Sequence, residues 1–238
     1  MISDSLFRRF YPDESRNGEV AFYSWVRKFI SPETVLLNLG AGPPANRGIR
    51  NLHGEVAKVV GADPDPEVLN NRDVDEAYVI PTVGPLPFED NSFDLVLSDW
   101  VVEHVVSPAR FLAEVRRVLK PGCSFFLRTP NKRHYVALIA RMTPHWCHEL
   151  IANWARGYPP GAHDPWPTVY RLNSRRSIET EAYKAGFRTV EIRMWEYDPK
   201  YLFFHPIPFV LGVGYERIVN RFDLLSGLRA SIFGRLIK

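Results

Sequence analysis

An apolar run, TVLLNL at residues 34–39, leads directly into the glycine- and proline-rich turn GAGPPA at residues 40–45. A continuous apolar run of this length is typical of a strand that a parallel sheet buries on both faces. Glycine has no side chain and lets the backbone approach a ligand closely, so a strand that ends in such a turn is frequent in nucleotide-binding sites. The stretch therefore favours folds that place a nucleotide at the end of a buried strand.

Strand and helix patterns alternate along the rest of the chain. Apolar runs predict further strands at 56–62, 92–98, 124–130 and 187–195, and helical spacing of apolar residues predicts helices over 17–30, 107–120 and 174–185. We expect one more helix after Asp65, which can cap it, with Pro66 at its first position. The alternation predicts an α/β fold with a Rossmann-like, doubly wound, mostly parallel sheet that binds ligands at the carboxyl ends of its strands.

We expect a single domain over residues 1–238, with three additions to the alternating pattern. They are an N-terminal helical segment at 1–30, an irregular segment at 132–170, and an apolar and basic C-terminal extension at 200–238. The irregular segment is rich in Trp, His, Pro and Gly, and we interpret it as an aromatic lid that contacts the acceptor. Apolar residues of the tail fall on a rough helical seam, made of Ile218, Phe222, Leu225, Ile232 and Leu236.

Cysteine usage and the apolar segments indicate the compartment. The two cysteines, Cys123 and Cys147, offer neither a disulfide scaffold nor a paired zinc-ligand spacing, which favours a reducing compartment. The N-terminus lacks the basic start and apolar run of a secretory signal. The apolar stretch 201–213 is too short to span a bilayer. We therefore expect a cytoplasmic protein, and peripheral membrane contact through the C-terminal segment stays open.

The charge is distributed unevenly. Residues 1–127 carry 13 Lys and Arg against 18 Asp and Glu, whereas residues 128–238 carry 17 against 9. A basic second half attracts nucleic acid, an anionic lipid surface or a phosphorylated small molecule, unless it is merely a solvated face. No dense Lys/Arg run or RNA-binding module occurs, so a small-molecule or lipid-linked acceptor is favoured over nucleic acid. The sequence leaves the oligomeric state open.

The glycine turn alone does not identify the nucleotide. Gly40 to Ala45 formally match G-x-G-x-x-[GA], and Asp63 lies 23 residues beyond Gly40, where a ribose-binding acid is expected. An acid at this place accepts hydrogen bonds from the ribose hydroxyls of any ribonucleoside. On these residues an NAD(P)-binding oxidoreductase remains an open alternative.

Residues 86–131 narrow the choice of cofactor. Their sequence is LPFEDNSFDLVLSDWVVEHVVSPARFLAEVRRVLKPGCSFFLRTPN. It closely resembles the fourth strand, the following helix and the fifth strand of class I S-adenosylmethionine-dependent methyltransferases, in particular the small-molecule, type 11-like group. The resemblance implies a seven-stranded sheet, S-adenosylmethionine as cofactor and S-adenosylhomocysteine as product. It further implies methyl transfer to oxygen, nitrogen or carbon of a small molecule, lipid or glycan precursor. Nucleic-acid amino-methyltransferases typically carry [DN]-P-P-[YF] where this chain has SDWV at 98–101, which disfavours base methylation.

The resemblance also implies which residues bind the cofactor. Gly40 and Gly42 would line its methionine portion and Asp63 would hold its ribose. The full set carried over is Asn38, Gly40, Ala41, Gly42, Asp63, Pro64, Thr82, Val83, Ser98, Asp99 and Trp100. Asn38 and Thr82 stand where the family often has acids, and a methyltransferase-like binding module without catalysis is therefore an alternative.

A general base is needed only for some acceptors, because the methyl group on a sulfonium is already electrophilic. We take Asp99, His104 and His134 as the catalytic candidates, and Glu103 and the His163-Asp164 pair as further candidates for the base. His145, Cys147 and His148 lack a convincing fourth ligand, so we expect no metal site.

Overall fold

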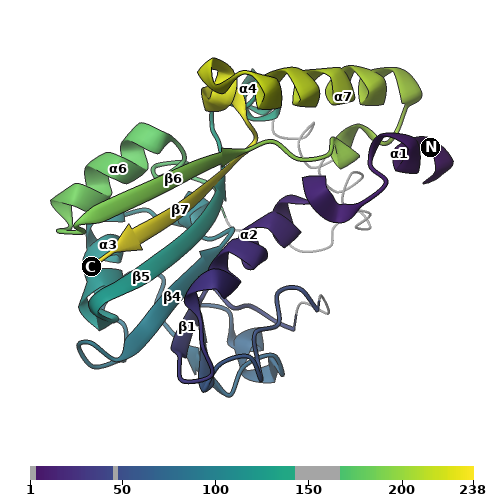
Figure 1. Cartoon of the computed structure of the whole chain (residues 1–238). Helices are drawn as coiled ribbons and strands as arrows, with labels where there is room; N and C mark the ends of the chain where they lie inside the picture. Colours follow the sequence, from purple (N-terminus) through teal and green to yellow (C-terminus); the bar gives the residue numbers. More distant parts are fainter. Residues whose placement is uncertain (1–3, 45–47, 143–166) are drawn as a thin grey trace. The chain divides into compact units, whose positions relative to one another are not determined.

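The computed structural model describes residues 4–44, 48–142 and 167–238 (Figure 1). Most of the expected aromatic lid, including His145, Trp146, Cys147 and the His163-Asp164 pair, lies outside the described residues. The chain divides into two compact units. The sheet unit comprises residues 19–130, 168–193 and 232–238, and the helical unit comprises residues 1–18, 131–167 and 194–231.

A seven-stranded sheet has the strand order β3-β2-β1-β4-β5-β7-β6. Its strands are β1 (Val35–Leu39), β2 (Lys58–Asp63), β3 (Glu76–Val79), β4 (Phe93–Asp99), β5 (Leu119–Pro130), β6 (Thr189–Trp195) and β7 (Ser231–Ile237). The pairs β1/β2, β1/β4, β2/β3 and β4/β5 are parallel. This arrangement confirms the α/β class and the seven strands expected from the sequence.

The sheet is mixed: four strand pairs are parallel, in line with the expected mostly parallel sheet, and the pair β5/β7 departs from it. The amide of Gly122, near the start of β5, donates to the carbonyl of Lys238 beyond the end of β7. The amide of Asn131, just past the end of β5, donates to the carbonyl of Ala230 before β7. The two strands therefore run antiparallel.

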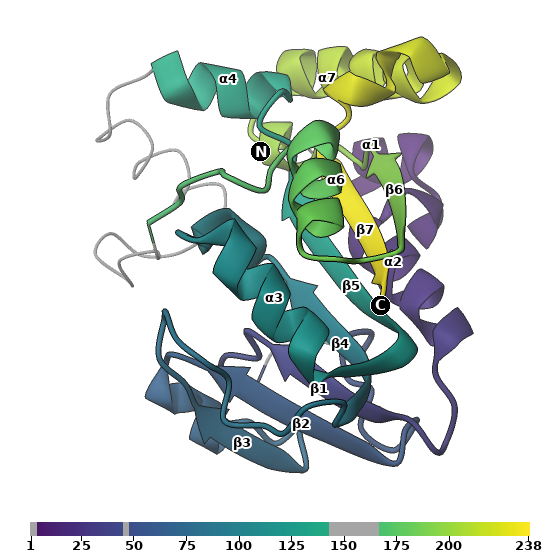
Figure 2. The same cartoon turned by 90° about the vertical axis from the view of Figure 1, so that its left-hand side faces the viewer.

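Helices cover both faces of the sheet. In the sheet unit, α3 (Pro108–Val118) and α6 (Arg175–Lys184) lie side by side on one face and α2 (Gly18–Val26) lies on the other (Figure 2). The helical unit contains α1 (Asp4–Phe10), α4 (Tyr135–Met142) and α7 (Pro206–Arg221). Short 3-10 helices join these elements at η1 (Glu14–Arg16), η2 (Arg27–Phe29), η3 (Pro66–Asn70), η4 (Val102–His104), η5 (Lys200–Leu202) and η6 (Asp223–Leu228).

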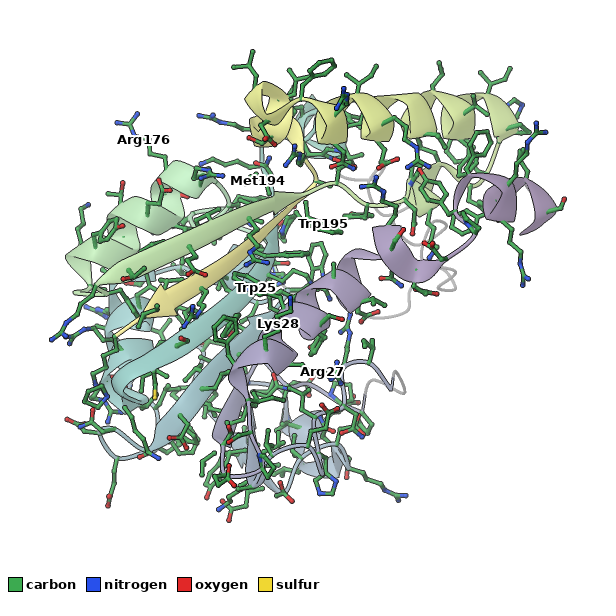
Figure 3. The ribbon with its side chains drawn as sticks, in the orientation of Figure 1. Trp25, Arg27, Lys28, Arg176, Met194 and Trp195 are labelled. Atoms are coloured by element: carbon green, nitrogen blue, oxygen red, sulfur yellow. The ribbon has the colours of Figure 1, made fainter. Side chains whose placement is uncertain are left out.

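The core of the sheet unit explains why α2 forms where the apolar pattern predicts a helix. Trp25 projects from α2 (Figure 3) and packs edge-on against Phe126 of β5, with ring centroids 5.1 Å apart. Phe22 contacts Phe233 of β7 at 5.2 Å. Both Phe22 and Phe126 are fully buried. Burial of a large apolar side chain contributes about 1.5–3 kcal/mol, so this face fixes the helix on the sheet.

Two local expectations need correction. The helix expected at 107–120 ends at Val118, and β5 begins at Leu119 with a register shift between the pairs Phe93↔Leu119 and Leu95↔Ser124. Pro121 and Gly122 thus lie in a strand irregularity, as proline and glycine in strands often do. After Asp65, whose side chain accepts from the amide of Glu67, only the 3-10 helix η3 forms.

The helical seam expected in the tail is wrong beyond Arg221. Residues 231–237 form strand β7, in which the side chains of Ile232 and Leu236 are fully buried. These two positions are i and i+4 in the sequence. This spacing places them on the same face of a helix and equally on the same face of a strand. Within the described residues, no helix is long and apolar enough to cross a membrane.

The strand assignment of the tail has a measurable consequence. We expect Leu236→Ala to lower the free energy of unfolding by about 2–5 kcal/mol, because it opens a cavity in the sheet core. Leu224→Ala is the matched control. Leu224 is 96% exposed in η6, so its replacement should change stability by less than about 0.5 kcal/mol. Urea unfolding measures both variants, and equal small effects would contradict the buried strand.

Candidate functional site

A cleft of the sheet unit lies where β1 and β4 end. Its volume is about 50 Å³, and the cleft is partly open to solvent. The residues that line it are Tyr23, Leu36, Asn38, Gly40, Ala41, Arg50, Leu52, Val59, Asn71, Asp73, Leu97 and Asp99. Four of these, Asn38, Gly40, Ala41 and Asp99, are among the cofactor-binding residues expected from the sequence.

The glycine turn packs against β4 and β2 with no room for a side chain at its first position. Gly40 has a φ of +88°, and a Cβ added there would overlap the side chain of Val101. Its amide donates to the carbonyl of Ala62 at 2.7 Å. Gly42 also has a positive φ, of +56°, but a Cβ there would meet nothing within 4 Å. Gly40 is thus required by packing and backbone conformation, whereas Gly42 leaves open space beside the backbone.

Asn71 binds the backbone of the glycine turn through its side chain. The sequence analysis missed this residue. Its side-chain amide donates to the carbonyls of Ala41, at 3.3 Å, and Gly42, at 2.9 Å. Its side-chain oxygen accepts from the amide of Asp73. Asn71 is buried and follows η3, so it ties the segment between β2 and β3 to the turn after β1. No local sequence signal distinguishes such an asparagine from one in an ordinary turn.

Asp63 ends β2 next to the same turn. One carboxylate oxygen accepts from the amide of Gly42 at 2.9 Å, and the other accepts from the amide of Asp65 at 2.8 Å. Burial raises the pKa of this carboxyl, while the two amide hydrogen bonds oppose the shift. Each oxygen keeps a second lone pair, so the group can also accept hydrogen bonds from the hydroxyls of a bound ligand.

Asp99 ends β4 in a network of opposite charges. Arg128 of β5 binds it through two contacts, Nε to Oδ1 at 2.5 Å and Nη2 to Oδ2 at 2.6 Å. The hydroxyl of Tyr23 donates to Oδ2 at 3.2 Å. Burial, together with the nearby Asp99, raises the pKa of Tyr23, so its phenol stays protonated. A bidentate pair of this kind fixes the carboxylate in one orientation at the cleft wall.

Arg50 adds a positive charge to the cleft wall, which the sequence analysis also missed. Its guanidinium pairs with Glu19 of α2, and Nη1 lies 3.8 Å from Oδ2 of Asp99. The cluster therefore contains two carboxylates, Glu19 and Asp99, and two guanidinium groups, Arg50 and Arg128. Side chains at positions 19, 50, 99 and 128 meet only in the folded chain, so no spacing rule in the sequence could have grouped them.

The remaining residues expected to bind cofactor do not line the cleft itself. Ser98 is buried, and its hydroxyl donates to the carbonyl of Leu39, which joins β4 to β1. Trp100 follows with a φ of +59°, and its amide donates to the carbonyl of Arg128. Pro64 is half-buried directly after β2, whereas Thr82 and Val83 are exposed between β3 and β4.

The three catalytic candidates fall in two units. Asp99 and His104 belong to the sheet unit, and His104 is half-buried at the end of η4. His134 belongs to the helical unit, where it is buried with its Nε2 atom 3.5 Å from Oε2 of Glu196. Neither histidine is among the cleft-lining residues. In the described part of the chain, no group of three or more His, Cys, Asp or Glu side chains is arranged to hold a metal ion.

Glu103 is a buried carboxyl beside the cleft residues. Its side chain is almost fully buried and accepts a hydrogen bond from the hydroxyl of Thr129 at 3.0 Å. Thr129 in turn accepts from the side chain of Asn173 at 2.7 Å. Burial raises the pKa of Glu103 from 4.5 to about 7. The group therefore exchanges its proton near neutral pH.

Comparison with known proteins agrees with this geometry. Residues 37–127 match the family described as a methyltransferase domain. The chain is 29% identical over 153 residues to the ubiquinone biosynthesis O-methyltransferase of Parvibaculum lavamentivorans. The matched region covers 60% of this chain and 55% of that protein. It spans about half the length of the curated relatives that it matches.

Solved structures share the fold over nearly the whole chain. An S-adenosylmethionine-dependent methyltransferase from Archaeoglobus fulgidus has a TM-score of 0.56 at 16% identity, covering 98% of this chain and 99% of that chain. The [4+2]-cyclase SpnF has a TM-score of 0.58 at 17% identity, covering 92% and 81%. Residues 37–127 are thus similar to a methyltransferase domain, and the chain shares the fold of these solved structures. The resemblance found in the sequence is thereby confirmed.

The buried carboxyl of Glu103 predicts a pH dependence of stability. Because its pKa is higher in the folded than in the unfolded chain, the contribution is fully present below pH 4.5 and is lost as the pH rises through about 7. We expect the loss to be about 3 kcal/mol of unfolding free energy. Glu103→Gln should remove this slope, whereas the exposed control Glu89→Gln should keep it. Urea unfolding at a series of pH values checks this, and an unchanged slope in Glu103→Gln would contradict it.

The close packing of the glycine turn predicts a difference between two equivalent substitutions. Gly40 and Gly54 have similar φ angles, +88° and +82°, but only Gly40 has a neighbour in the way of a Cβ. Gly54→Ala should lower the unfolding free energy by about 1–2 kcal/mol through backbone strain alone. Gly40→Ala should lower it by about 1–3 kcal/mol more because of overpacking. Equal losses in thermal or urea unfolding would mean that Val101 does not crowd the turn.

Proposed function

We propose that this protein transfers a methyl group from S-adenosylmethionine to oxygen, nitrogen or carbon of a small molecule, lipid or glycan precursor. The observation that carries the proposal is the convergence of the glycine turn, Asp63 and Asp99 at the carboxyl ends of β1, β2 and β4, within a methyltransferase domain. Ligands of open α/β sheets bind at this edge.

The residues present suit the cofactor. Its methionine portion carries an ammonium and a carboxylate, and the cleft wall offers a carboxylate at Asp99 and a guanidinium at Arg50. Beside Gly42 the backbone has open space. Asp63 has lone pairs left for the ribose hydroxyls. We assign Pro64, Thr82 and Val83 to the adenine side, and Ser98 and Trp100 to the mouth toward the acceptor.

Catalysis then rests mainly on positioning. S-adenosylmethionine, when bound, supplies a methyl group that is already electrophilic. The chain's own task is to hold the acceptor atom in line with that methyl and to keep water out. For an acceptor that must lose a proton, Asp99, His104 and His134 are the groups to test. Both oxygens of Asp99 contact Arg128, so it would first have to leave this pair to take a proton.

The acceptor is proposed to be small or lipid-linked. The relative from Parvibaculum is named as an O-methyltransferase of ubiquinone biosynthesis, which makes a hydroxyl acceptor the first class to screen. We propose a cytoplasmic location with peripheral membrane contact, and no role for nucleic acid.

A binding or non-methylating role is the second candidate. SpnF, a [4+2]-cyclase, shares the fold, so the architecture also accommodates other chemistry. In this chain the neutral Asn38 lies in the cleft where the family often has an acid. Cofactor binding without methyl transfer to any acceptor of a broad panel would favour this candidate.

Calorimetric titration with S-adenosylmethionine and S-adenosylhomocysteine tests the proposal. We expect both to bind and Asp63→Asn to weaken binding by about tenfold to a hundredfold, since charge-assisted hydrogen bonds contribute about 1.5–3 kcal/mol. Asp65→Asn is the matched control, because asparagine caps a helix as well as aspartate does. NAD serves as the control ligand.

Two results would contradict the proposal. If neither sulfur ligand binds a folded wild-type protein, the cleft does not hold this cofactor. If Asp63→Asn and Asp65→Asn bind equally well, the ribose is not held by Asp63. Urea unfolding of each variant separates loss of binding from loss of the fold.

A further inference from the structure

Helix α7 of the helical unit has two distinct faces. One face is buried and consists of Phe209, Gly212, Val213, Glu216 and Val219. It packs on α1, where the ring of Phe7 lies 6.1 Å from that of Phe209 and the hydroxyl of Tyr11 donates to Glu216. At about 100° of rotation per residue, the positions 207, 210, 211, 214 and 218 fall on the opposite face.

This opposite face is apolar and exposed. Together with the residues that follow the helix, it forms what we name the α7 stripe, made of Ile207, Val210, Leu211, Ile218, Phe222 and Leu224. Leu211 is 69% exposed and Leu224 is 96% exposed. A single exposed apolar residue needs no explanation, but a continuous apolar helix face usually marks a docking surface.

The charges beside the stripe are basic. Arg217 and Arg221 are exposed on α7, and Arg221 makes no ion pair within the described residues. The only acidic residue of α7 is Glu216, which is buried on the other face. Asp223, at the start of η6, is exposed but pairs with Arg229. An apolar helix face edged by arginine is the pattern of helices that lie in the surface of a bilayer.

We propose that the α7 stripe docks on an anionic lipid surface. The apolar side chains would enter the boundary between headgroups and acyl chains, while Arg221 contacts the anionic headgroups. Arg217, whose guanidinium is held by Glu216 and by the carbonyl of Phe10, adds positive charge beside them. A second copy of the chain fits this face less well. A symmetric dimer through the stripe would bring Arg221 of both copies to one interface, where the two like charges repel. The inference concerns the helical unit and does not depend on the proposed methyl transfer.

Vesicle co-sedimentation of the full chain, without cofactor, tests the proposal. We expect binding to vesicles of phosphatidylcholine with phosphatidylglycerol, much weaker binding to phosphatidylcholine alone, and a decrease with added salt. The double variant Ile207→Ser/Leu211→Ser should lose at least about tenfold in affinity, because it removes two inserted apolar side chains. Arg221→Glu should lose about tenfold, since it replaces a cation with an anion.

Two controls on α6 of the sheet unit match these changes. Arg176, which projects from α6 (Figure 3), is exposed, and so is Tyr183. Arg176→Glu and Tyr183→Ser alter charge and apolar surface to a similar extent and should leave vesicle binding unchanged. All four variants change exposed side chains, so each should unfold at the same urea concentration as the wild type.

Several outcomes would overturn the proposal. They are the absence of binding to anionic vesicles at low salt, equal binding to neutral and anionic vesicles, or equal losses in the α6 controls. Light scattering gives a separate check. A dimer that Ile207→Ser/Leu211→Ser dissociates would assign the stripe to a second copy. Cofactor titration of the same variants keeps this test distinct from that of the proposed function.

Discussion

The site depends on the close approach of the backbone at Gly40 to its neighbours. The amide of Gly40 bonds to Ala62 of β2, and the place of its missing side chain is taken by Val101 just after β4. The turn is therefore fixed by the ends of the two strands that flank β1, and this packing requires glycine at position 40. Asn71 and Asp63 add hydrogen bonds to the next two residues of the turn. This is why the cleft forms where three parallel strands end together.

A charge network, of which Asp99 and Arg50 line the cleft, is the second constraint on the site. Desolvation of ions is costly, and removing one member of a buried pair leaves its partner uncompensated. In this site, Asp99 and Glu19 are matched by Arg128 and Arg50, so no single charge is left alone. Such a network contributes less to stability than to order, because it holds Tyr23 and the Asp99 carboxylate in fixed positions. A preorganised wall of this kind is suited to a ligand that carries both charges.

The sequence predicted the helices and strands whose apolar residues form a continuous run or recur at a regular spacing. Strands β1, β2, β4 and β5 and helices α2 and α3 were found because each has an apolar run or stripe. Strand β3 was missed, because this edge strand is only four residues long and mostly exposed. Strand β7 was mistaken for helix, because Ile232 and Leu236 fit both periods. The glycine turn and Asp99 were located through motifs, whereas Asn71 and Arg50 are brought to the cleft by long-range packing alone.

At position 38, the charges already present in the cleft favour a neutral side chain over an acidic one. Asn38 pairs in register with Gly61 of β2 and Leu97 of β4, so its place on the cleft wall is set by the sheet. An acid at this position would add a third carboxylate to a cleft that is lined by Asp73 and Asp99 and by one guanidinium group, that of Arg50. Like charges in a poorly solvated site repel strongly. A neutral amide is therefore compatible with a cofactor site in which Asp99 supplies the negative charge and Arg50 the positive charge.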